Sequence, residues 1–479
     1  MKTVLFWFRR DLRLSDNPAL RAALNAADRV VPVYIHSPHE EGDWGPGGAS
    51  RWWLMKSLAR LDRRLWDHDS RLIIRQGDAL DCLHSLLAST AAEAVFWNRL
   101  YEPAVVERDR KIKEWLKQQG YHAESHNGAL LVEPWELRTG KGEPYRVFTP
   151  FWRALSKRDE PDSPLQKPRT LRPTAQWPSS LALDELKLLS GIGWEDKLET
   201  HWQPGEAGAG DAMDRFLDQA LVDYKTARDL PDVSGTSRLS PHLHFGEISP
   251  RQAWHRVRSR MAGQAAVEEG GWTWLRELGW REFAHHVLFE FPHTPDQPLY
   301  SRWQDFPWRK NHEAFVLAWQ RGETGYPIVD AGMRELWETG YMHNRVRMIA
   351  ASVLVKNIRA PWLSGAKWFW DTLVDADLAN NTMGWQWSAG CGADAAPYFR
   401  IFNPFTQSRR FDPEGRYLRR WLPELSKLPD RDLHAPHEAA DGILHHAGLR
   451  LDRDYPRPIV DYKSSREEAL AAARAVASS

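Results

Sequence analysis

Cysteine is nearly missing from this chain, and so is any long apolar run near its start. Of the 479 residues, Cys82 and Cys391 alone are cysteines, too few for a disulfide framework or a cysteine-based metal cluster. This composition fits a reducing cytoplasm. The segment Met1–Arg10 has too short an apolar stretch for a signal peptide or a membrane span. We therefore expect a cytoplasmic protein with no membrane segment and no bound metal.

A net charge is also missing, because 64 basic residues balance 64 acidic ones. The whole molecule is therefore no electrostatic attractor for nucleic acid, although a local basic face is compatible with this balance. Two nucleotide-binding signatures are absent as well: no Gly-x-Gly-x-x-Gly follows a strand pattern, and no Walker loop occurs. These absences exclude a standard dinucleotide site and a standard nucleoside triphosphate site.

Tryptophan, in contrast, is abundant, with 26 residues. Each indole is large and carries one N–H to satisfy, so most must pack in the core, while a minority could stack on a flavin or a base, or carry electrons. The stretch Asp375–Trp387, continued by Tyr398–Pro404, combines acids, amides, tryptophans and an arginine. Buried carboxylates and amides are costly unless satisfied. This stretch therefore predicts a site for a polar aromatic ligand.

The order of the patterns predicts two fold classes in one chain. Apolar runs alternate with helical patterns in the first part, which predicts an α/β region with a doubly wound parallel sheet. The expected strands are Val4–Phe8, Val30–Ile35, Leu72–Arg75 and Val95–Trp97. Later patterns are helical, beyond a segment rich in Pro, Ser, Lys and Arg. We predict an α/β domain over residues 1–130, an interdomain linker over 131–205 and an all-α domain over 206–479.

Two polar groupings stand out in the predicted helical part. Gly235–Pro241 is a hydroxyl-rich loop that enters a helix, which suits an anion cradle or, more commonly, plain helix capping. Trp274, Glu277 and Arg281 recur at helical spacing and share one face. They form either part of a site or a Glu–Arg surface pair with buried tryptophan.

A third grouping lies on another predicted helix and consists of Tyr341, Asn344, Arg347 and Met348. The two acids Asp375 and Asp377 follow later. They either cap a helix, accept hydrogen bonds from a ribose or a ring N–H, or pair with Arg347. His242 and His244 have no cluster of other ligands around them in the sequence, so we expect structural histidines and not metal ligands.

Basic and aromatic residues alternate between Arg345 and Arg420. This mixture fits phosphate contact with base stacking and, equally, a solvated helix face.

With these groupings in place, the chain resembles the photolyase/cryptochrome flavoproteins, in particular bacterial cyclobutane pyrimidine dimer (CPD) photolyases. The resemblance spans nearly the whole chain. Its motifs, in order, are Phe6-Trp-Phe-Arg-Arg-Asp-Leu-Arg13, Gly235-Thr-Ser-Arg-Leu-Ser240, Trp280-Arg-Glu-Phe283, Gly325-Tyr-Pro-Ile-Val-Asp330, Met342-His-Asn-Arg345 and the stretch from Asp375. The resemblance implies an N-terminal α/β antenna domain and a helical C-terminal domain that holds FAD.

The resemblance also implies which residues bind FAD. They are Tyr224, Thr236, Ser237, Arg238, Leu239, Ser240, Trp274, Arg281, Tyr341, Arg347, Asp375, Asp377 and Asn381. Asn381 matches the position beside the flavin N5, where an amide can accept a hydrogen bond from a protonated N5. The next two residues, Thr382-Met383, depart from the Asn-Gly of many bacterial relatives, so the surroundings of N5 can differ in detail.

The activity that the resemblance implies is light-driven DNA repair by a monomer. An electron passes from FADH⁻ to a pyrimidine dimer flipped out of UV-damaged DNA, and the cyclobutane ring splits. The residues matched to dimer contacts are Glu277, Trp280, Asn344, Met348 and Trp387. The electron path to oxidised FAD is matched by Trp308, Trp362 and Trp385, and the phosphate contacts by Arg228, Arg345 and Arg400.

An antenna pigment is implied as well, with Glu102 in the contact region. Methenyltetrahydrofolate is the expected pigment and a deazaflavin the alternative. Two other activities compete with CPD repair. A (6-4) photolyase would be expected to carry a histidine where Asn344 stands. A cryptochrome photoreceptor often lacks the dimer pocket and has a long C-terminal tail, whereas here the last expected helix, Ser465–Ala475, lies near the end of the sequence.

Overall fold

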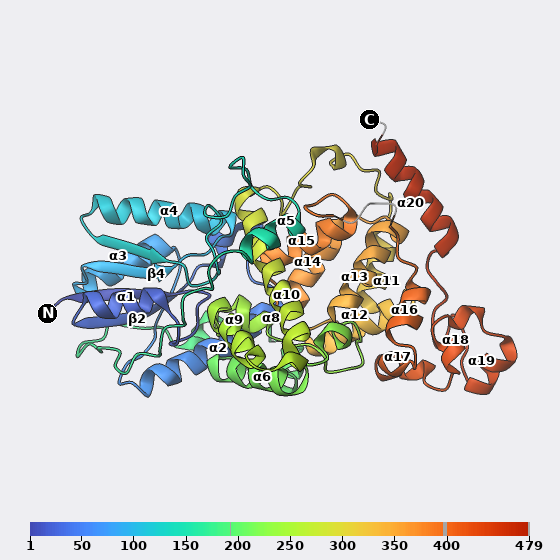
Figure 1. Cartoon of the computed structure of the whole chain (residues 1–479), viewed down its shortest axis with the longest axis horizontal. Coiled ribbons are helices and arrows are strands. Elements are labelled where there is room, and N and C mark those ends of the chain that lie inside the picture. The colour runs from blue at the N-terminus through green and yellow to red at the C-terminus, as the bar shows by residue number, and fades with distance from the viewer. Residues whose placement is uncertain (192, 396–399, 478–479) are drawn as a thin grey trace. The chain divides into compact units, whose positions relative to one another are not determined.

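The computed structural model describes residues 1–191, 193–395 and 400–477 (Figure 1). Contacts between residues divide the chain into two compact units. The sheet unit comprises Met1–Val222, Ser237–Pro292 and Val374–Asp377, and the helical unit comprises Asp223–Thr236, His293–Leu373 and Leu378–Ser479. These units follow contacts in space, whereas the predicted domains 1–130, 131–205 and 206–479 follow the chain, so those boundaries stay a prediction.

A parallel sheet forms the centre of the sheet unit. Its strands, within the part of the chain that the structure describes, are β1 (Thr3–Phe8), β2 (Arg29–His36), β3 (Ile73–Gln76), β4 (Ala94–Asn98) and β5 (His122–His126). They lie in the order β3-β2-β1-β4-β5, and every neighbouring pair is parallel. The chain therefore starts in the middle of the sheet and winds outward in both directions, which confirms the predicted doubly wound α/β class.

Helices cover this sheet because consecutive parallel strands need a crossover. The helices of the sheet unit are α1 (Pro18–Ala26), α2 (Gly48–Trp66), α3 (Ala79–Thr90), α4 (Pro103–Gln118), α5 (Phe148–Leu155), α6 (Glu206–Gln219), α8 (Ser240–His244), α9 (Pro250–Met261) and α10 (Ala265–Glu290). Leu5 and Trp7 of β1 share one core cluster with residues of α3 and α4. Residues of opposite parity in β1, such as Phe6, face the other side. Figure 1 shows the strands and the helices α1 to α4 in blue to cyan, and α6, α9 and α10 in green to yellow-green.

The segment predicted as a linker is part of the sheet unit. Trp177 packs against the same core cluster as α3 and α4. The backbone N–H of Ile74 donates to Ser180 Oγ at 2.8 Å, and that of Leu181 to the Ile74 carbonyl at 3.1 Å. This part of the chain therefore packs along the edge strand β3.

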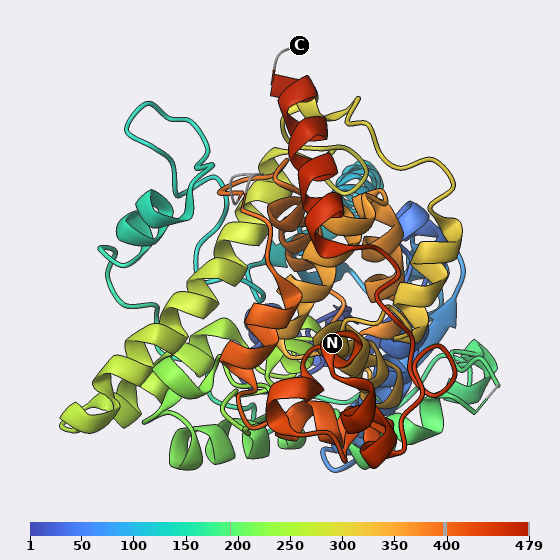
Figure 2. The same ribbon diagram turned by 90° about the vertical axis from the view of Figure 1, so that its right-hand side faces the viewer.

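The helical unit has no strand among its described residues, which confirms the predicted all-α class. Its helices are α7 (Tyr224–Ala227), α11 (Glu313–Arg321), α12 (Pro327–Thr339), α13 (Asn344–Ser352), α14 (Trp362–Thr372), α15 (Leu378–Ala389), α16 (Pro404–Phe411), α17 (Arg416–Trp421), α18 (Asp430–Leu433), α19 (Asp441–Ala447) and α20 (Tyr462–Ala477). A π-helical turn, Val353–Ile358, continues α13. The last helix α20 packs against that turn and leads to the C-terminus in Figure 2.

Candidate functional site

The hydroxyl-rich loop of the sheet unit is built around a left-handed residue. Arg238 has φ 51°, a conformation that non-glycine residues rarely adopt. On either side of it, Ser237 Oγ accepts from Trp274 Nε1 at 3.2 Å, and Ser240 Oγ donates to Asp375 Oδ2 at 2.6 Å. Ser240 is the first residue of α8 and makes no side-chain cap. The loop therefore joins four residues of the predicted FAD set, and the simple capping interpretation of Ser240 is wrong.

A buried carboxylate with two imidazoles lies in the same unit. Asp377 Oδ2 is 3.3 Å from His244 Nδ1 and 3.5 Å from His285 Nε2. The three residues are 7%, 9% and 5% exposed. Burial alone would raise the pKa of Asp377, but His285 and His244 outweigh it and hold that pKa well below its usual range. Asp377 is therefore ionised at neutral pH.

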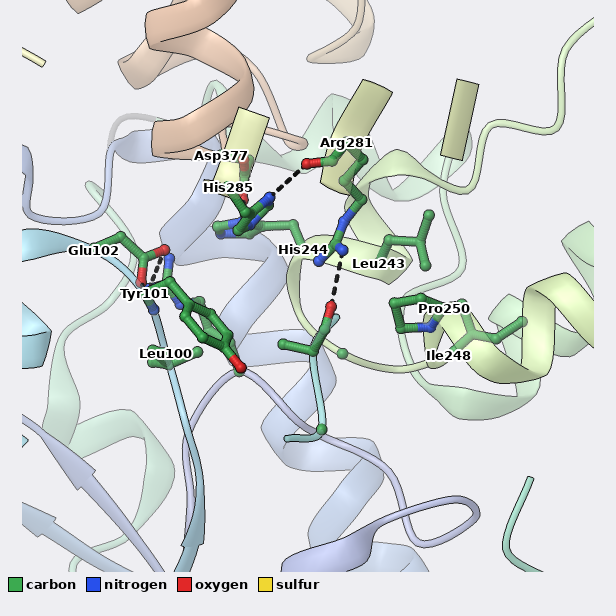
Figure 3. Close-up of a pocket in the computed structure, with 14 residues that line it drawn as sticks. Leu100, Tyr101, Glu102, Leu243, His244, Ile248, Pro250, Arg281, His285 and Asp377 are labelled. Carbon is green, nitrogen blue, oxygen red and sulfur yellow. Dashed lines mark hydrogen bonds and ion pairs between the residues drawn. The ribbon is translucent and has the colours of Figure 1, made fainter. Parts of the chain in front are cut away.

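These three residues line one small cavity with residues from the sheet edge, shown in Figure 3. The cavity measures about 20 Å³, enough for a water molecule. Arg10 and Glu102, which also line the cavity, form an ion pair of 2.5 Å. The cavity therefore places Glu102, the predicted antenna contact, and Asp377, a predicted FAD contact, around a single buried polar space.

The guanidinium of Arg281 reaches the segment after β5. Its Nη1 donates to the Ala129 carbonyl at 2.8 Å. The neighbouring Glu282 accepts from the backbone N–H of Leu131 at 2.8 Å and of Val132 at 3.3 Å. Burial raises the pKa of Glu282 to about 7, against the opposing effects of Arg281, His285 and these two amides. Two adjacent side chains of helix α10, Arg281 and Glu282, thereby form hydrogen bonds with the backbone of residues 129–132.

The predicted dimer contacts of α10 lie at its surface. Glu277 and Trp280 are both half-buried. The Trp280 indole stacks on Phe148 with ring centroids 3.7 Å apart and an interplanar angle of 11°. Phe148 was missed by sequence reasoning, because α5 lies more than a hundred residues upstream and an isolated phenylalanine gives no signal. One face of Trp280 is thus covered within the sheet unit.

The remaining dimer contacts belong to the helical unit. Asn344 is exposed, and Met348 and Trp387 are half-buried. Met348 Sδ lies 4.0 Å from Asn344 Nδ2 and 3.9 Å from Arg345 Nη1. Helix α13 begins at Asn344 with His343 as its N-cap, which brings Asn344 and Met348 together one turn apart. Burial lowers the pKa of His343 to about 4.

Tyr341 precedes that helix, so its predicted place on the helix is wrong; Gly340, in the left-handed conformation, ends α12 just before it. The Arg347 guanidinium nevertheless reaches back over the Tyr341 ring at 5.1 Å, and Arg347 Nε donates to the Met342 carbonyl at 2.7 Å. Tyr224, buried in α7, has the Arg228 guanidinium 5.5 Å from its ring centroid. Thr236, also in this unit, is half-buried.

Two of the predicted phosphate contacts, Arg345 and Arg400, have polar partners within the helical unit, Arg345 through its side chain and Arg400 through its backbone. Arg345 Nη2 forms an ion pair of 2.6 Å with Asp229, and its guanidinium lies 4.5 Å from the Phe411 ring centroid. Arg400 is exposed, and its carbonyl accepts from Lys356 Nζ at 2.9 Å. Tyr398 and Phe399, from the polar aromatic stretch, lie outside the described residues.

One hydrogen bond to the backbone orients the side-chain amide of Asn381. Its Nδ2 donates to the Ala366 carbonyl of α14 at 3.1 Å. Because a carbonyl can only accept, this bond assigns the nitrogen to that side and leaves Oδ1 on the other side as an acceptor. The following residue Thr382 is buried, and its hydroxyl has no hydrogen-bond partner among the described residues.

Aromatic residues surround Trp385 in the same unit. Its ring centroid is 6.0 Å from that of Trp319 and 5.1 Å from that of Phe369, both edge-on. Trp362, at the start of α14, is buried at 5% exposure. A Cβ on Gly365 would lie 2.0 Å from the Trp385 ring, so glycine is what allows this close packing. Sequence reasoning missed Trp319, which is fully buried and donates from Nε1 to the Ala350 carbonyl at 3.0 Å.

Trp308 belongs to a separate cluster. It is half-buried, lies 4.5 Å from Phe306, and packs with that ring against Ala469 and Ala472 of α20. The helix is held there by Glu468, which pairs with Arg359 at 2.9 Å. The last helix therefore covers one side of the outermost predicted electron carrier.

Among the residues that the structure describes, no group of three or more His, Cys, Asp or Glu side chains is arranged to hold a metal ion. No helix in these ranges combines the length and the apolar character needed to cross a membrane.

Comparison with known proteins agrees with this geometry. Residues 4–169 match the family described as DNA photolyase, and residues 274–475 match the FAD binding domain of DNA photolyase. A deoxyribodipyrimidine photo-lyase of Agrobacterium fabrum is 48% identical over 99% of this chain and 98% of its own length. Cryptochrome-1 of Arabidopsis thaliana is 41% identical over 97% of this chain and 70% of its own length.

A solved structure gives the same result for the fold. The crystal structure of a bacterial class III photolyase from Agrobacterium tumefaciens superposes with a TM-score of 0.96 at 47% identity, and covers 100% of this chain and 98% of the other. Identity at this level over the full length exceeds what a shared fold alone produces. This chain belongs to the photolyase/cryptochrome family.

Proposed function

We propose that this chain is a deoxyribodipyrimidine photo-lyase, a flavoprotein that uses light to split cyclobutane pyrimidine dimers in damaged DNA. The observation that carries the proposal is the near half identity, over the full chain, to a protein of that name. The set of predicted dimer contacts supports it, because Glu277, Trp280, Asn344, Met348 and Trp387 are all present. Each of them is exposed or half-buried and therefore accessible to a ligand.

The residues predicted to bind FAD suit that cofactor. Ser237, Ser240 and the left-handed Arg238 offer hydroxyl and backbone donors of the kind that bind phosphates. Asp375 and Asp377 offer buried carboxylates that can accept from ribose hydroxyls or a ring N–H. When bound and reduced, FAD supplies the electron that opens the cyclobutane ring, and the protein binds, orients and tunes it.

Asn381 is proposed to fix the hydrogen bonding at the flavin N5. Its amide nitrogen is held by the Ala366 carbonyl, so Oδ1 is the atom left to accept a hydrogen bond from a protonated N5. An aspartate in its place would lose the donor to Ala366 and add a negative charge beside the anionic FADH⁻, so the neutral asparagine suits the reduced cofactor.

Glu277 and Trp280 are proposed to hold the flipped-out dimer. Phe148 covers one face of Trp280, which leaves the opposite face for stacking on a pyrimidine. The Glu277 carboxylate can hydrogen-bond the base edges from the same face of α10. Asn344, Met348 and Trp387 complete this set, and Arg228, Arg345 and Arg400 are proposed phosphate contacts. Arg345 must exchange Asp229 for a phosphate to act in this way.

Trp385, Trp362 and Trp308 are proposed to carry electrons to oxidised FAD. The aromatic surroundings of Trp385 support a role in fast electron transfer. We further propose that Glu102 contacts a methenyltetrahydrofolate antenna, with a deazaflavin as the alternative, and that the protein acts as a monomer in the cytoplasm.

A blue-light photoreceptor is the second candidate, supported by the 41% identity to cryptochrome-1 of Arabidopsis thaliana. One experiment separates the two functions. The purified protein, reduced and illuminated with blue light, is given an oligonucleotide with a single thymine dimer, and a dark sample serves as control. Light-dependent loss of the dimer is expected. Binding of FAD without any repair would favour the photoreceptor, and repair of a (6-4) photoproduct alone would reassign the substrate.

A further inference from the structure

The protonation state of His285 can be read from its two hydrogen-bonding partners. His285 Nδ1 lies 2.9 Å from the Arg281 carbonyl, which can only accept, so Nδ1 carries a proton. His285 Nε2 lies 3.5 Å from Asp377 Oδ2, another acceptor. An unprotonated Nε2 would place its lone pair against a carboxylate oxygen. A proton on both nitrogens satisfies both neighbours, and this state is the imidazolium cation.

His244 has a different state. Its Nδ1 faces the same oxygen, Asp377 Oδ2, at 3.3 Å and donates to it. Burial lowers the pKa of His244, and the nearby Arg10 lowers it further, against the raising effect of Asp377. His244 therefore donates as a neutral ring. One cation and one neutral donor therefore converge on a single carboxylate oxygen.

We propose that His285 is a positioning residue for the flavin: its imidazolium, aided by His244, holds the Asp377 carboxylate ionised, oriented and charge-balanced for cofactor binding. The inference rests on the proposed function, in which Asp377 contacts FAD. It goes further by giving the cofactor site a titratable cation that lies outside the predicted FAD set.

The charge balance of the cavity explains why this cation matters. Arg10 is paired with Glu102, and Arg281 is adjacent to Glu282. Among the residues that line the cavity, His285 brings a positive charge to 3.5 Å from the Asp377 carboxylate. Removal of its proton would take that charge away from a buried carboxylate, which is costly. The titratable or charged groups around the pair are Arg10, Tyr101, Glu102, His244, Arg281, Glu282 and His286.

The test measures FAD binding to the full-length apoprotein, by fluorescence of free FAD, from about pH 6 to about pH 9, the range over which histidines exchange protons. His285→Gln, which can donate but carries no charge, is expected to bind FAD about tenfold more weakly at neutral pH, because a charge-assisted contact to Asp377 is lost. His285→Arg keeps a permanent cation with several donors and is expected to restore affinity. Wild-type affinity is expected to fall toward high pH, whereas the arginine variant stays flat.

A matched control comes from the next residue. His286 is buried to a similar extent as His285. Its Nε2 lies 3.1 Å from the Val132 carbonyl, whereas the Nε2 of His285 faces Asp377. His286→Gln is expected to keep the wild-type affinity and its pH profile. Circular dichroism melts establish that each variant is folded, and if His285→Gln does not fold, the contrast between wild type and His285→Arg decides.

Two results would overturn the inference: wild-type affinity in His285→Gln, or the same pH profile in wild type and His285→Arg. Either result, with dimer repair intact in wild type, would leave the proposed function standing. A wild-type protein that neither binds FAD nor repairs a dimer would remove the proposed function itself.

Discussion

The two compact units differ in the kind of chemistry that their predicted site residues can perform. The sheet unit holds the buried charges, Asp377 with its two imidazoles and the pair Arg10–Glu102. The helical unit holds the proposed electron carriers, with Trp385 against Trp319 and Phe369. The buried charges and the proposed electron path therefore lie in different parts of the chain. Each part can be altered separately, and the following predictions use that separation.

The largest expected effect concerns the aromatic side. Trp385→Phe removes the indole from its ring cluster, so light-driven reduction of oxidised FAD is expected to fall to background. Repair by enzyme that was chemically reduced beforehand is expected to survive. Absorbance of the flavin under blue light measures the first, and the dimer assay the second. Trp319→Phe, a change in the same cluster, serves as control and should retain photoreduction; normal photoreduction in Trp385→Phe would take Trp385 out of the electron path.

The next effect concerns the charged side and its dependence on pH. Folding raises the pKa of Glu282 from an ordinary 4.5 to about 7, so between these values the folded protein binds more protons than the unfolded one. The stability from this group is full below about pH 4.5 and is lost as pH rises through about 7, an effect of about 3 kcal/mol.

Glu282→Gln keeps an acceptor for the Leu131 and Val132 amides but cannot ionise. Urea unfolding at several pH values should show that this variant gains most over wild type above neutral pH. An unchanged difference across the pH range would mean that Glu282 does not titrate in that window.

A smaller effect is expected at the proposed dimer contact of α10. Glu277→Ala is expected to lower the repair rate about tenfold, through the loss of about one charge-assisted hydrogen bond, while FAD stays bound. Glu268→Ala, an exposed acid in the first turn of the same helix, should repair normally. Loss of FAD from the Glu277 variant would move this residue from the dimer set to the cofactor set.

The smallest effect concerns DNA affinity. Binding of dimer-containing DNA is expected to weaken steeply as salt rises, because phosphate contacts release counterions. Asp229→Asn frees Arg345 from its ion pair and is expected to tighten binding several-fold at low salt. Filter binding at a series of salt concentrations measures both. A flat salt response would contradict the proposed basic contact surface.

Local signals in the sequence predicted local structure well. The pair Ser249-Pro250 predicts a helix start, and α9 begins there. The structure adds a capping box between Ser249 and Gln252. Strand β5 was missed, because His122–His126 is a polar edge strand without an apolar run. The sequence also predicts Ser50 as a helix cap, and this prediction is wrong. Helix α2 begins at Gly48, and the Ser50 hydroxyl is buried without a hydrogen-bond partner in the described ranges.

Partners distant in the chain were out of reach of the sequence patterns. The resemblance named Asp377, but its neighbours His244 and His285 come from segments about a hundred residues away, and only folding brings them to one oxygen. His244 was expected to be a structural histidine. Its contact with Asp377 gives that expectation a more specific meaning.

Gly365 has a practical use that follows from its missing side chain. A methyl group there would overlap the Trp385 ring, so Gly365→Ala would push helix α14 and the Trp385 ring apart without altering any aromatic side chain. Electron transfer rates depend steeply on separation. This single position therefore works as a spacer, by which distances along the proposed tryptophan path can be adjusted while its chemical composition stays fixed.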